Sequence, residues 1–366
     1  MTFSSFIILN LALGAASLAL LLPWHSVAAR LPKLILGICI GMAVAIATIN
    51  AITSYFGTGR DSNIRPVVKG LLEKADKSRP QLLLVGSSYS ALGVDDSVVE
   101  REMNNRGYPV QVLELAKPGN FAISQDFTID YYLARAGKVP EYVFIELGPE
   151  YYSDPGALGP SYLYTGTSIA DHALSQFWWR LRSILTYPSD PFQKLAKVSN
   201  LTTHFLYNVF NFGLSGQLVA DKDLAPVPGF TPSDKAHKPL EWHELSPIEN
   251  SAAPLSRDPV PPHVTFLLDY RRWQTKKLME RGAKVVGYYQ VAMVPEGIRV
   301  YGVQVCRELR ELPCFTGDDI EVRQQLQDPA FWYDSVHLLH SGAEKYSVWF
   351  ASRVADILTA SRLASE

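Results

Sequence analysis

The chain has no surplus of charge of one sign. Its 34 Lys and Arg residues nearly balance its 36 Asp and Glu residues, so the formal net charge over 366 residues is −2. Proteins that bind nucleic acid through its phosphates carry a basic field or a basic stripe. The composition therefore gives no reason to expect a nucleic-acid partner.

Cysteines and metal-ligand spacings are scarce as well. Of the three cysteines, Cys39 lies in an apolar run, so only Cys306 and Cys314 could pair. They form either a disulfide, which requires an oxidising compartment, or two free thiols. Four scattered histidines show no spacing typical of a metal site: His172, His204, His243 and His263. The sequence predicts neither a metal nor another cofactor.

Charged side chains are missing altogether from residues 1–24 and 34–59. Each run supplies the roughly 20 apolar residues that a membrane-spanning helix needs, and the start lacks the positive region of a cleaved signal peptide. We predict a hairpin of two transmembrane helices, or alternatively one span at 34–55 behind an interfacial first segment. The positive-inside rule places Arg30 and Lys33 in the cytoplasm. In both cases the anchor, residues 1–59, leaves the rest of the chain facing the periplasm or the cell exterior.

After the anchor, residues 60–80 are polar and predict a stalk with one short helix near 67–77. Alternating strand and helix patterns follow, which indicate an α/β domain with a parallel sheet over residues 81–366. The predicted strands are 82–85, 110–115, 142–147, 284–289 and 312–315, and the predicted helices are 95–106, 124–136, 264–281 and 341–363. A proline-rich stretch at 155–262 interrupts the pattern. We interpret it as an insertion that caps the site or docks a partner.

The first predicted strand runs directly into Gly86-Ser87-Ser88. In open parallel sheets, ligands bind outside the carboxyl ends of the strands. A serine at that edge, at the start of a helix, has backbone N–H groups beside it that can hold an oxyanion. Its hydroxyl is a candidate nucleophile; an ordinary serine-rich turn is the alternative.

The quartet Asp334-Ser335-Val336-His337 precedes the last predicted helix. Three residues of separation let the carboxylate turn back onto the imidazole, fix its tautomer and leave the other ring nitrogen for a serine. A structural pair that caps the helix is the alternative. A second quartet, Asp234 to His237, lies among prolines, and we interpret it as a solvated loop.

Together the two motifs resemble those of the SGNH/GDSL hydrolase superfamily. The resemblance covers residues 81–363, interrupted by the insertion, and implies a flavodoxin-like, three-layer α/β/α sandwich. It implies Ser88 as nucleophile and Asp334 and His337 as the other members of a catalytic triad. It also implies an oxyanion hole formed by the N–H groups of Ser88 and Gly119.

Two positions depart from the family pattern. Ser87 stands where the family usually has aspartate, and the third block, Gly148-Pro149-Glu150, lacks the family's asparagine. Asn120 is the substitute oxyanion donor that we predict. Both departures resemble the membrane-anchored branch of the superfamily, which includes proteins of D-alanyl-lipoteichoic acid and alginate O-acetylation systems. This branch implies a membrane-bound O-acyltransferase as partner.

Two further residues are predicted to contact substrate. Tyr89 follows the candidate nucleophile, and Glu150 follows the third predicted strand, where it could bind substrate hydroxyls. A solvated loop edge is the alternative for Glu150.

The motifs and the predicted anchor favour O-acyl transfer, with acetyl the favoured group, to a cell-envelope or secreted glycan through an acyl-enzyme. A carbohydrate esterase is one alternative, because the same triad can pass the acyl group to water. Membrane anchoring favours transfer, since acyl groups drawn from the cytoplasm must be handed across the bilayer. A non-catalytic scaffold of an envelope polysaccharide complex is the other alternative, which the missing asparagine supports.

Overall fold

The structure is a computed structural model of the chain. It describes residues 65–118, 120, 122–148, 230–237, 240–241, 245 and 262–365, with a few isolated positions between 181 and 198. The predicted membrane anchor and most of the predicted insertion lie outside the described residues. Among the helices that are described, none has the length and apolar character needed to cross a membrane.

Five parallel strands form one sheet in the order β2-β1-β3-β4-β5. Their bounds are β1 Gln81–Gly86, β2 Gln111–Ala116, β3 Tyr142–Glu146, β4 Val285–Gln290 and β5 Cys314–Thr316. The prediction of a parallel α/β sheet is therefore confirmed, with small shifts at the strand ends. The chain leaves β1 for β2 on one side and reaches β3 on the other. The topological switch point, where doubly wound sheets bind ligands, thus lies between β1 and β3.

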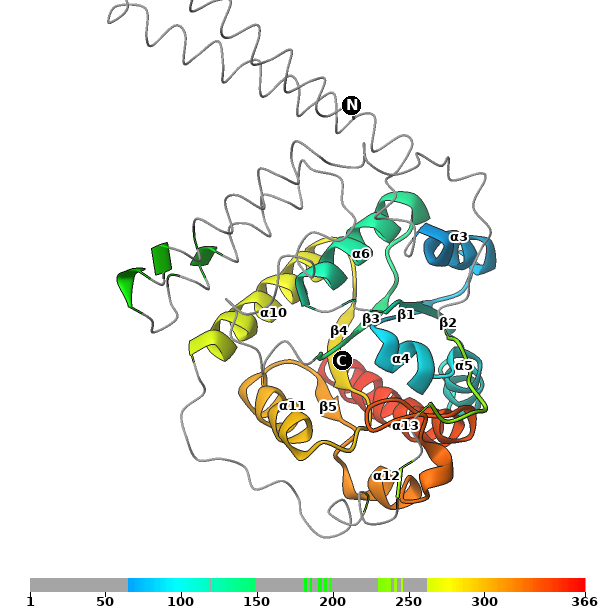
Figure 1. The fold of residues 1–366 in the computed structure, drawn as a ribbon. Coiled ribbons are helices and arrows are strands. Elements are labelled where there is room, and N and C mark those ends of the chain that lie inside the picture. Colours follow the sequence, from blue (N-terminus) through cyan, green and yellow to red (C-terminus); the bar gives the residue numbers. More distant parts are fainter. Residues whose placement is uncertain are drawn as a thin grey trace, which may run out of the picture. The chain divides into compact units, whose positions relative to one another are not determined.

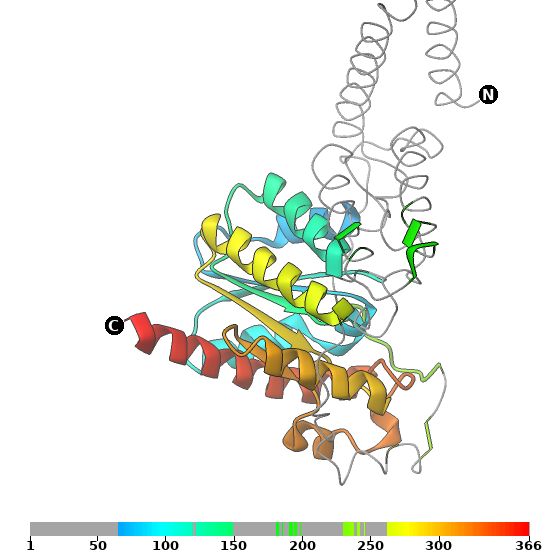
Figure 2. The same ribbon diagram turned by 90° about the vertical axis from the view of Figure 1, so that its left-hand side faces the viewer.

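Helices cover both faces of this sheet. Helices α3, α6 and α10 lie on one side and α4, α5 and α13 on the other, as Figures 1 and 2 show from two directions. The bounds are α3 Arg65–Lys74, α4 Ser88–Gly93, α5 Asp96–Asn105, α6 Ala122–Ala136, α10 Pro262–Glu280, α11 Glu296–Glu308, α12 Ile320–Gln325 and α13 His340–Ser365, with a short 3-10 helix, η7, at Pro329–Phe331. The sequence patterns did not predict α11 and α12.

The main core lies between the sheet and helices α5 and α13. Aliphatic residues of β1 and β2 fill one end, and an aromatic cluster from α13 fills the other. In that cluster, the Phe350 ring meets the Tyr289 ring edge-on with centroids 5.0 Å apart, and Trp349 packs edge-on against Phe315. Burial of large rings contributes much of the packing energy of a core. The cluster fixes the start of α13, and with it the preceding loop, at the carboxyl edge of the sheet.

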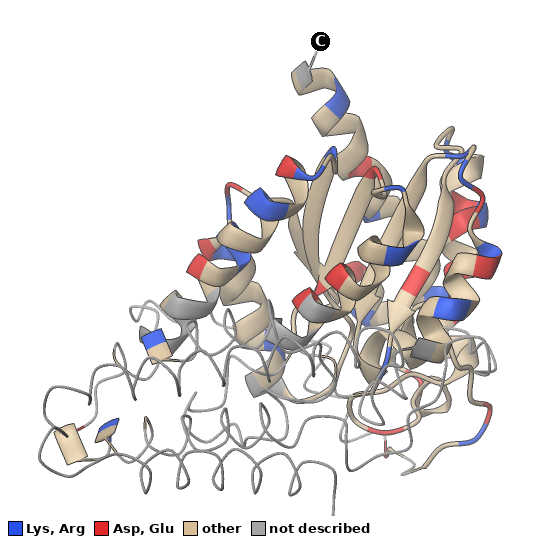
Figure 3. Cartoon of the chain, turned by 90° about the horizontal axis from the view of Figure 1, so that it is seen from above, with Lys and Arg blue, Asp and Glu red and all other residues tan. Residues whose placement is uncertain are grey.

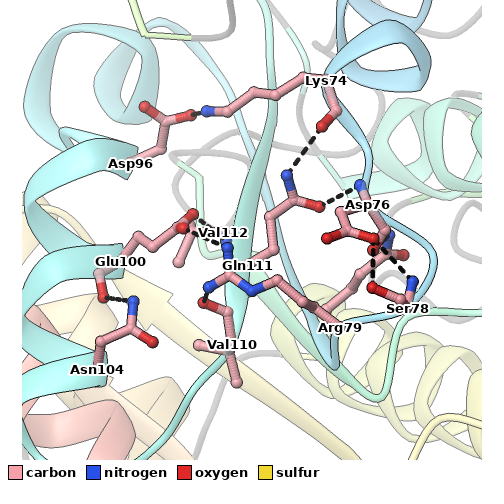
Figure 4. A network of polar contacts seen from close by, with 11 residues as sticks. Lys74, Asp76, Ser78, Arg79, Asp96, Glu100, Asn104, Val110, Gln111 and Val112 are labelled. Atoms are coloured by element: carbon pink, nitrogen blue, oxygen red, sulfur yellow. Dashed lines mark hydrogen bonds and ion pairs between the residues drawn. The ribbon is translucent and has the colours of Figure 1, made fainter.

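A polar network anchors the opposite end of β1 and β2 (Figure 4). Arg79 donates to Glu100 Oε1 at 2.9 Å and to the Val110 carbonyl at 2.7 Å. Glu100 Oε2 accepts the N–H of Val112 at 2.9 Å. These bonds satisfy backbone groups of the edge strand β2 and join it to α5.

The predicted short helix near 67–77 is present as α3. Its residues Val67, Val68 and Leu71 are buried, so this part of the predicted stalk packs against the domain. Burial of these side chains follows from the helical spacing of the apolar positions.

Cys306 of α11 and Cys314 of β5 form a disulfide, with their Cα atoms 5.2 Å apart. Of the two alternatives that the sequence left open, the structure shows the bonded one.

Basic and acidic residues are interspersed over the described helices. Figure 3 shows no stripe of a single sign among the described residues on the face that it displays. This arrangement agrees with the balanced composition.

Candidate active site

The candidate nucleophile lies at the first turn of α4. Ser87 is the N-cap of this helix, and its Oγ accepts the N–H of Tyr89 at 3.2 Å. Capping by a serine hydroxyl is the reason the helix starts here. The next residue, Ser88, is partly exposed at the carboxyl end of β1, beside the switch point of the sheet.

The Asp334–His337 quartet lies on a loop that is closed at its base. Trp332 and Leu338 form an antiparallel bridge, and both side chains are buried. The N–H of Tyr333 donates to the His337 carbonyl at 2.9 Å. The side chains of Asp334 and His337 therefore project from a short hairpin whose ends are held in the core.

Asp334 is oriented by the backbone of its own loop. Its Oδ1 accepts the N–H groups of Val336 and His337, each at 2.9 Å. This local turn is a usual role of aspartate. It directs the carboxylate onto the imidazole, whose Nδ1 lies 3.0 Å from Oδ1 and 2.9 Å from Oδ2.

The structure brings Ser88, Asp334 and His337 together. His337 Nε2 lies 2.9 Å from Ser88 Oγ, although 249 residues separate them. With Asp334 accepting at Nδ1, a neutral imidazole carries its proton there and presents a lone pair on Nε2 to the serine hydroxyl. Side-chain exposures of 17% for His337 and 21% for Asp334 leave the group open to a substrate from solution.

A buried glutamate lies directly beneath the turn that carries Ser88. Glu146, the last residue of β3, is fully buried. Its Oε2 accepts the N–H groups of Ser87 at 2.9 Å and Ser90 at 3.1 Å. The hydroxyls of Ser87 and Ser90 also donate to this carboxylate. All four donors thus come from one turn.

Tyr289 of β4 extends this buried network. Its Oη lies 2.7 Å from Ser90 Oγ, and because Ser90 donates to Glu146, the tyrosine hydroxyl is the donor to Ser90. Burial, followed by the charge of Glu146, raises the pKa of Tyr289 well above its usual range. Tyr289 therefore stays protonated and serves as a donor.

Gly86 is required by the same packing. A Cβ at this position would lie 2.9 Å from Glu146 Oε2 and closer still to the Ser90 hydroxyl. Any larger residue would push the carboxylate away from the turn. The glycine of the Gly86-Ser87-Ser88 motif is thus explained by the close approach of Glu146 and Ser90.

The predicted oxyanion donors differ in what the structure shows of them. The Ser88 N–H makes no hydrogen bond within the described residues, because it is the first N–H of α4 and the neighbouring ones are engaged. Asn120 is buried and its Nδ2 donates to the Gly86 carbonyl at 3.0 Å, while its Oδ1 accepts from Thr128 at 3.0 Å. Asn120 thus ties the loop after β2 to the end of β1. Gly119 lies outside the described residues.

Of the two predicted substrate-binding residues, the structure describes one. The Tyr89 ring lies 5.1 Å from that of His337, centroid to centroid, so it borders the triad. Glu150 lies outside the described residues.

The described end of the predicted insertion contacts the Asp334–His337 loop. The N–H of Thr231 donates to the Ala91 carbonyl of α4 at 2.6 Å, and that of His237 donates to Tyr333 at 2.8 Å. The exposed His237 ring also stacks on Tyr333 at 5.5 Å. The loop is solvated as expected, but it links α4 to the Asp334–His337 loop.

Sequence reasoning missed Glu146 and Tyr289. Both lie in continuous apolar runs, where a polar residue at a strand end carries no sign of its partner. Within the described part of the chain, no cluster of three or more His, Cys, Asp or Glu residues has the geometry to hold a metal ion.

Comparison with protein-family models and with curated proteins finds no match to this chain.

Proposed function

We propose that this protein transfers an acyl group, acetyl being favoured, to a hydroxyl of a cell-envelope or secreted glycan through a Ser88 acyl-enzyme. The observation that carries the proposal is the hydrogen-bonded chain from Ser88 Oγ to His337 Nε2 and from His337 Nδ1 to Asp334. If Asp334 and His337 only capped the last helix, a serine hydroxyl beside Nε2 of His337 would have no role. The order of the strands and these motifs together support an SGNH-like, flavodoxin-like sandwich.

In the first half-reaction, Ser88 Oγ bonds to the acyl carbon of an ester donor while His337 Nε2 accepts the hydroxyl proton. The carbonyl oxygen becomes an oxyanion beside the Ser88 N–H. The bond between the acyl carbon and the leaving oxygen then breaks, and His337 passes its proton to that oxygen. Asp334 stabilises the imidazolium in between.

In the second half-reaction, a glycan hydroxyl attacks the acyl carbon and gives its proton to His337. The bond to Ser88 Oγ breaks, and the serine recovers the proton. Water in place of the glycan gives hydrolysis, so the acceptor decides between transferase and esterase.

The disulfide supports an extracytoplasmic location, because such bonds persist mainly in oxidising compartments. The charge-free runs at 1–24 and 34–59 support a membrane anchor. Together they favour a partner in the membrane, a membrane-bound O-acyltransferase, as the source of the acyl group.

The test incubates the full-length protein in detergent with an aryl acetate. The burst of released phenol and the mass of the acetylated protein are measured. Ser88→Ala is expected to abolish the acetyl adduct, and Ser88→Ala and His337→Ala are expected to lower the rate by at least about 10³-fold. Adding an oligosaccharide acceptor then separates transfer from hydrolysis by where the acetyl group is recovered.

His340→Ala is the matched control for His337→Ala. His340 is three residues along the chain, and its ring nitrogens lie 3.7 Å from Asp234 and 3.8 Å from Asp95. Within the described residues, the hydrogen bond of Ser88 Oγ goes to His337 instead. Full activity in the Ser88→Ala protein would overturn the proposal. Full complementation of a deletion strain by Ser88→Ala and His337→Ala would instead support the scaffold alternative.

A further inference from the structure

We infer that Glu146 is the positioning residue of the nucleophile, because its carboxylate holds the Ser87–Ser90 turn and leaves the Ser88 N–H as its open donor. The inference rests on the proposed function for its catalytic consequence. Its structural part, the hold on the turn, stands on the contacts alone.

The N–H groups of the turn are engaged at every position but one within the described residues. Those of Ser87 and Ser90 donate to Glu146 Oε2, and that of Tyr89 donates to Ser87 Oγ. The N–H of Ala91 donates to the Ser87 carbonyl at 3.0 Å. Within the described residues, Ser88 alone in this turn keeps an N–H without an acceptor. That N–H belongs to the residue whose Oγ meets His337.

The Glu146 carboxylate is well compensated although it is buried. A buried carboxylate is costly unless hydrogen bonds satisfy it. Glu146 receives four such bonds, two from N–H groups and two from hydroxyls. Charge-assisted hydrogen bonds of this kind are shorter and stronger than neutral ones. They fix the turn rigidly without using Ser88 itself.

The position of Glu146 on β3 aims its side chain at the turn. Glu146 follows Phe144, which pairs with Leu84, by two residues, so it lies on the sheet face that α4 covers. It crosses the switch point between β1 and β3 to reach the turn. The glutamate therefore supplies from the neighbouring strand a carboxylate that the turn itself, with Ser87, lacks.

The chain offers a matched control on the same face. Glu114 of β2 pairs with Leu84 in register and is fully buried too. Neither of its carboxyl oxygens has a hydrogen-bond partner in the described part of the chain. Glu114→Gln thus makes the same chemical change in a buried strand without touching the turn.

The activity test compares Glu146→Gln with Glu114→Gln. An amide in place of Glu146 loses one acceptor atom and points an NH₂ group at the donors of the turn. We expect kcat for the aryl acetate to fall about 100-fold with little change in KM, and reaction with a fluorophosphonate to slow equally. Glu114→Gln is expected to match the wild type.

A second substitution tests whether position, rather than general stability, is at stake. Aspartate at N-cap position 87 accepts the N–H groups two and three residues along, those of Tyr89 and Ser90, and leaves the Ser88 N–H open. The same geometry is seen at the N-cap of α5, where Asp95 accepts from Ser97 and Val98. In the wild-type background, Ser87→Asp places two buried carboxylates against each other. It should therefore slow the reaction of Ser88 with the fluorophosphonate. In the Glu146→Gln protein, Ser87→Asp restores one carboxylate, and the amide of the introduced glutamine can donate to it. There the aspartate should raise the rate of reaction with the fluorophosphonate. This reversal of sign is expected only of directly coupled residues.

Amide hydrogen exchange tests the hold on the turn without any activity. Glu146→Gln should speed exchange at Ser87 and Ser90 by at least about tenfold relative to Glu114→Gln, while exchange in β1 stays unchanged. Unchanged exchange at both residues, or an unchanged kcat, would overturn the inference even if Ser88→Ala is inactive. Faster exchange in a protein whose wild type never reacts with the probes would leave the hold on the turn established and reject the proposed function.

Discussion

Two buried glutamates on one face of the sheet have opposite surroundings. Glu146 is saturated by the donors of the α4 turn, whereas Glu114 has no hydrogen-bond partner in the described part of the chain. Burial, followed by the charges of Asp96 and Asp95, raises the pKa of Glu114 well above its usual 4.5, and Lys74 opposes this only in part. A group that is costly to ionise stays protonated in the folded protein.

This difference predicts how stability depends on pH. The folded state keeps the Glu114 proton, while the unfolded chain releases it above its ordinary pKa of 4.5. The contribution of this proton to the free energy of unfolding is thus fully present below pH 4.5. It is lost as the pH rises toward the raised pKa of Glu114 in the folded state. The side chain that Glu114→Gln introduces is neutral at every pH. Above about pH 5, the free energy of unfolding of this variant should therefore rise relative to that of the wild type, by up to about 1.4 kcal/mol per pH unit. Urea unfolding of both proteins at a series of pH values from about 5 to about 8 measures this difference, and a difference that stays constant with pH contradicts it.

At the scale of elements, the disulfide joins α11 to β5 across eight residues of sequence. Strand β5 is short, with only Cys314, Phe315 and Thr316, and it lies at the edge of the sheet. A covalent link limits the freedom of this segment in the unfolded chain. We therefore expect this edge of the sheet to be less stable under reducing conditions.

Removing the link should destabilise the protein. For a loop of this length, the chain-entropy estimate is about 2–3 kcal/mol. Cys306→Ser with Cys314→Ser should lower the midpoint of thermal unfolding, and dithiothreitol should lower the wild-type midpoint to the same value. The double variant should not respond to the reductant. A wild type that is equally insensitive would show that the bond does not contribute.

For the whole molecule, the charge-free runs at 1–24 and 34–59 and the disulfide bear on the same question of location. The proposed topology puts Arg30 and Lys33, between the two runs, on the cytoplasmic side of the membrane. It puts the domain with the disulfide on the opposite side, where such bonds persist.

Reporter fusions test this topology. Alkaline phosphatase folds only where disulfides form, so its fusion after Glu366 should be active and a β-galactosidase fusion inactive. Replacing Arg30 and Lys33 by alanine should weaken that difference, because the positive charges set the orientation. An active β-galactosidase fusion to the unaltered chain would place the domain in the cytoplasm.

The parallel α/β sheet was predictable from the sequence, and the sequence also supplied the hypothesis of a Ser88, Asp334 and His337 triad. Continuous apolar runs of strand length, and a D-x-x-H quartet before a helix, are local patterns, because they depend on neighbours within a few residues. The disulfide was left as one of two alternatives, since pairing depends on whether two thiols come within reach.

The contacts beneath Ser88, the candidate nucleophile, follow from the tertiary structure alone. Glu146 reaches Ser87 across 59 residues of sequence, and Tyr289 reaches Ser90 across 199. These contacts depend on the strand order, which places β3 beside β1 and β4 beside β3. A glutamate at the end of an apolar strand looks the same in the sequence whether it faces solvent or a serine turn. Its role follows from the fold because long-range contacts, unlike helical or strand periodicity, are set by how the elements pack.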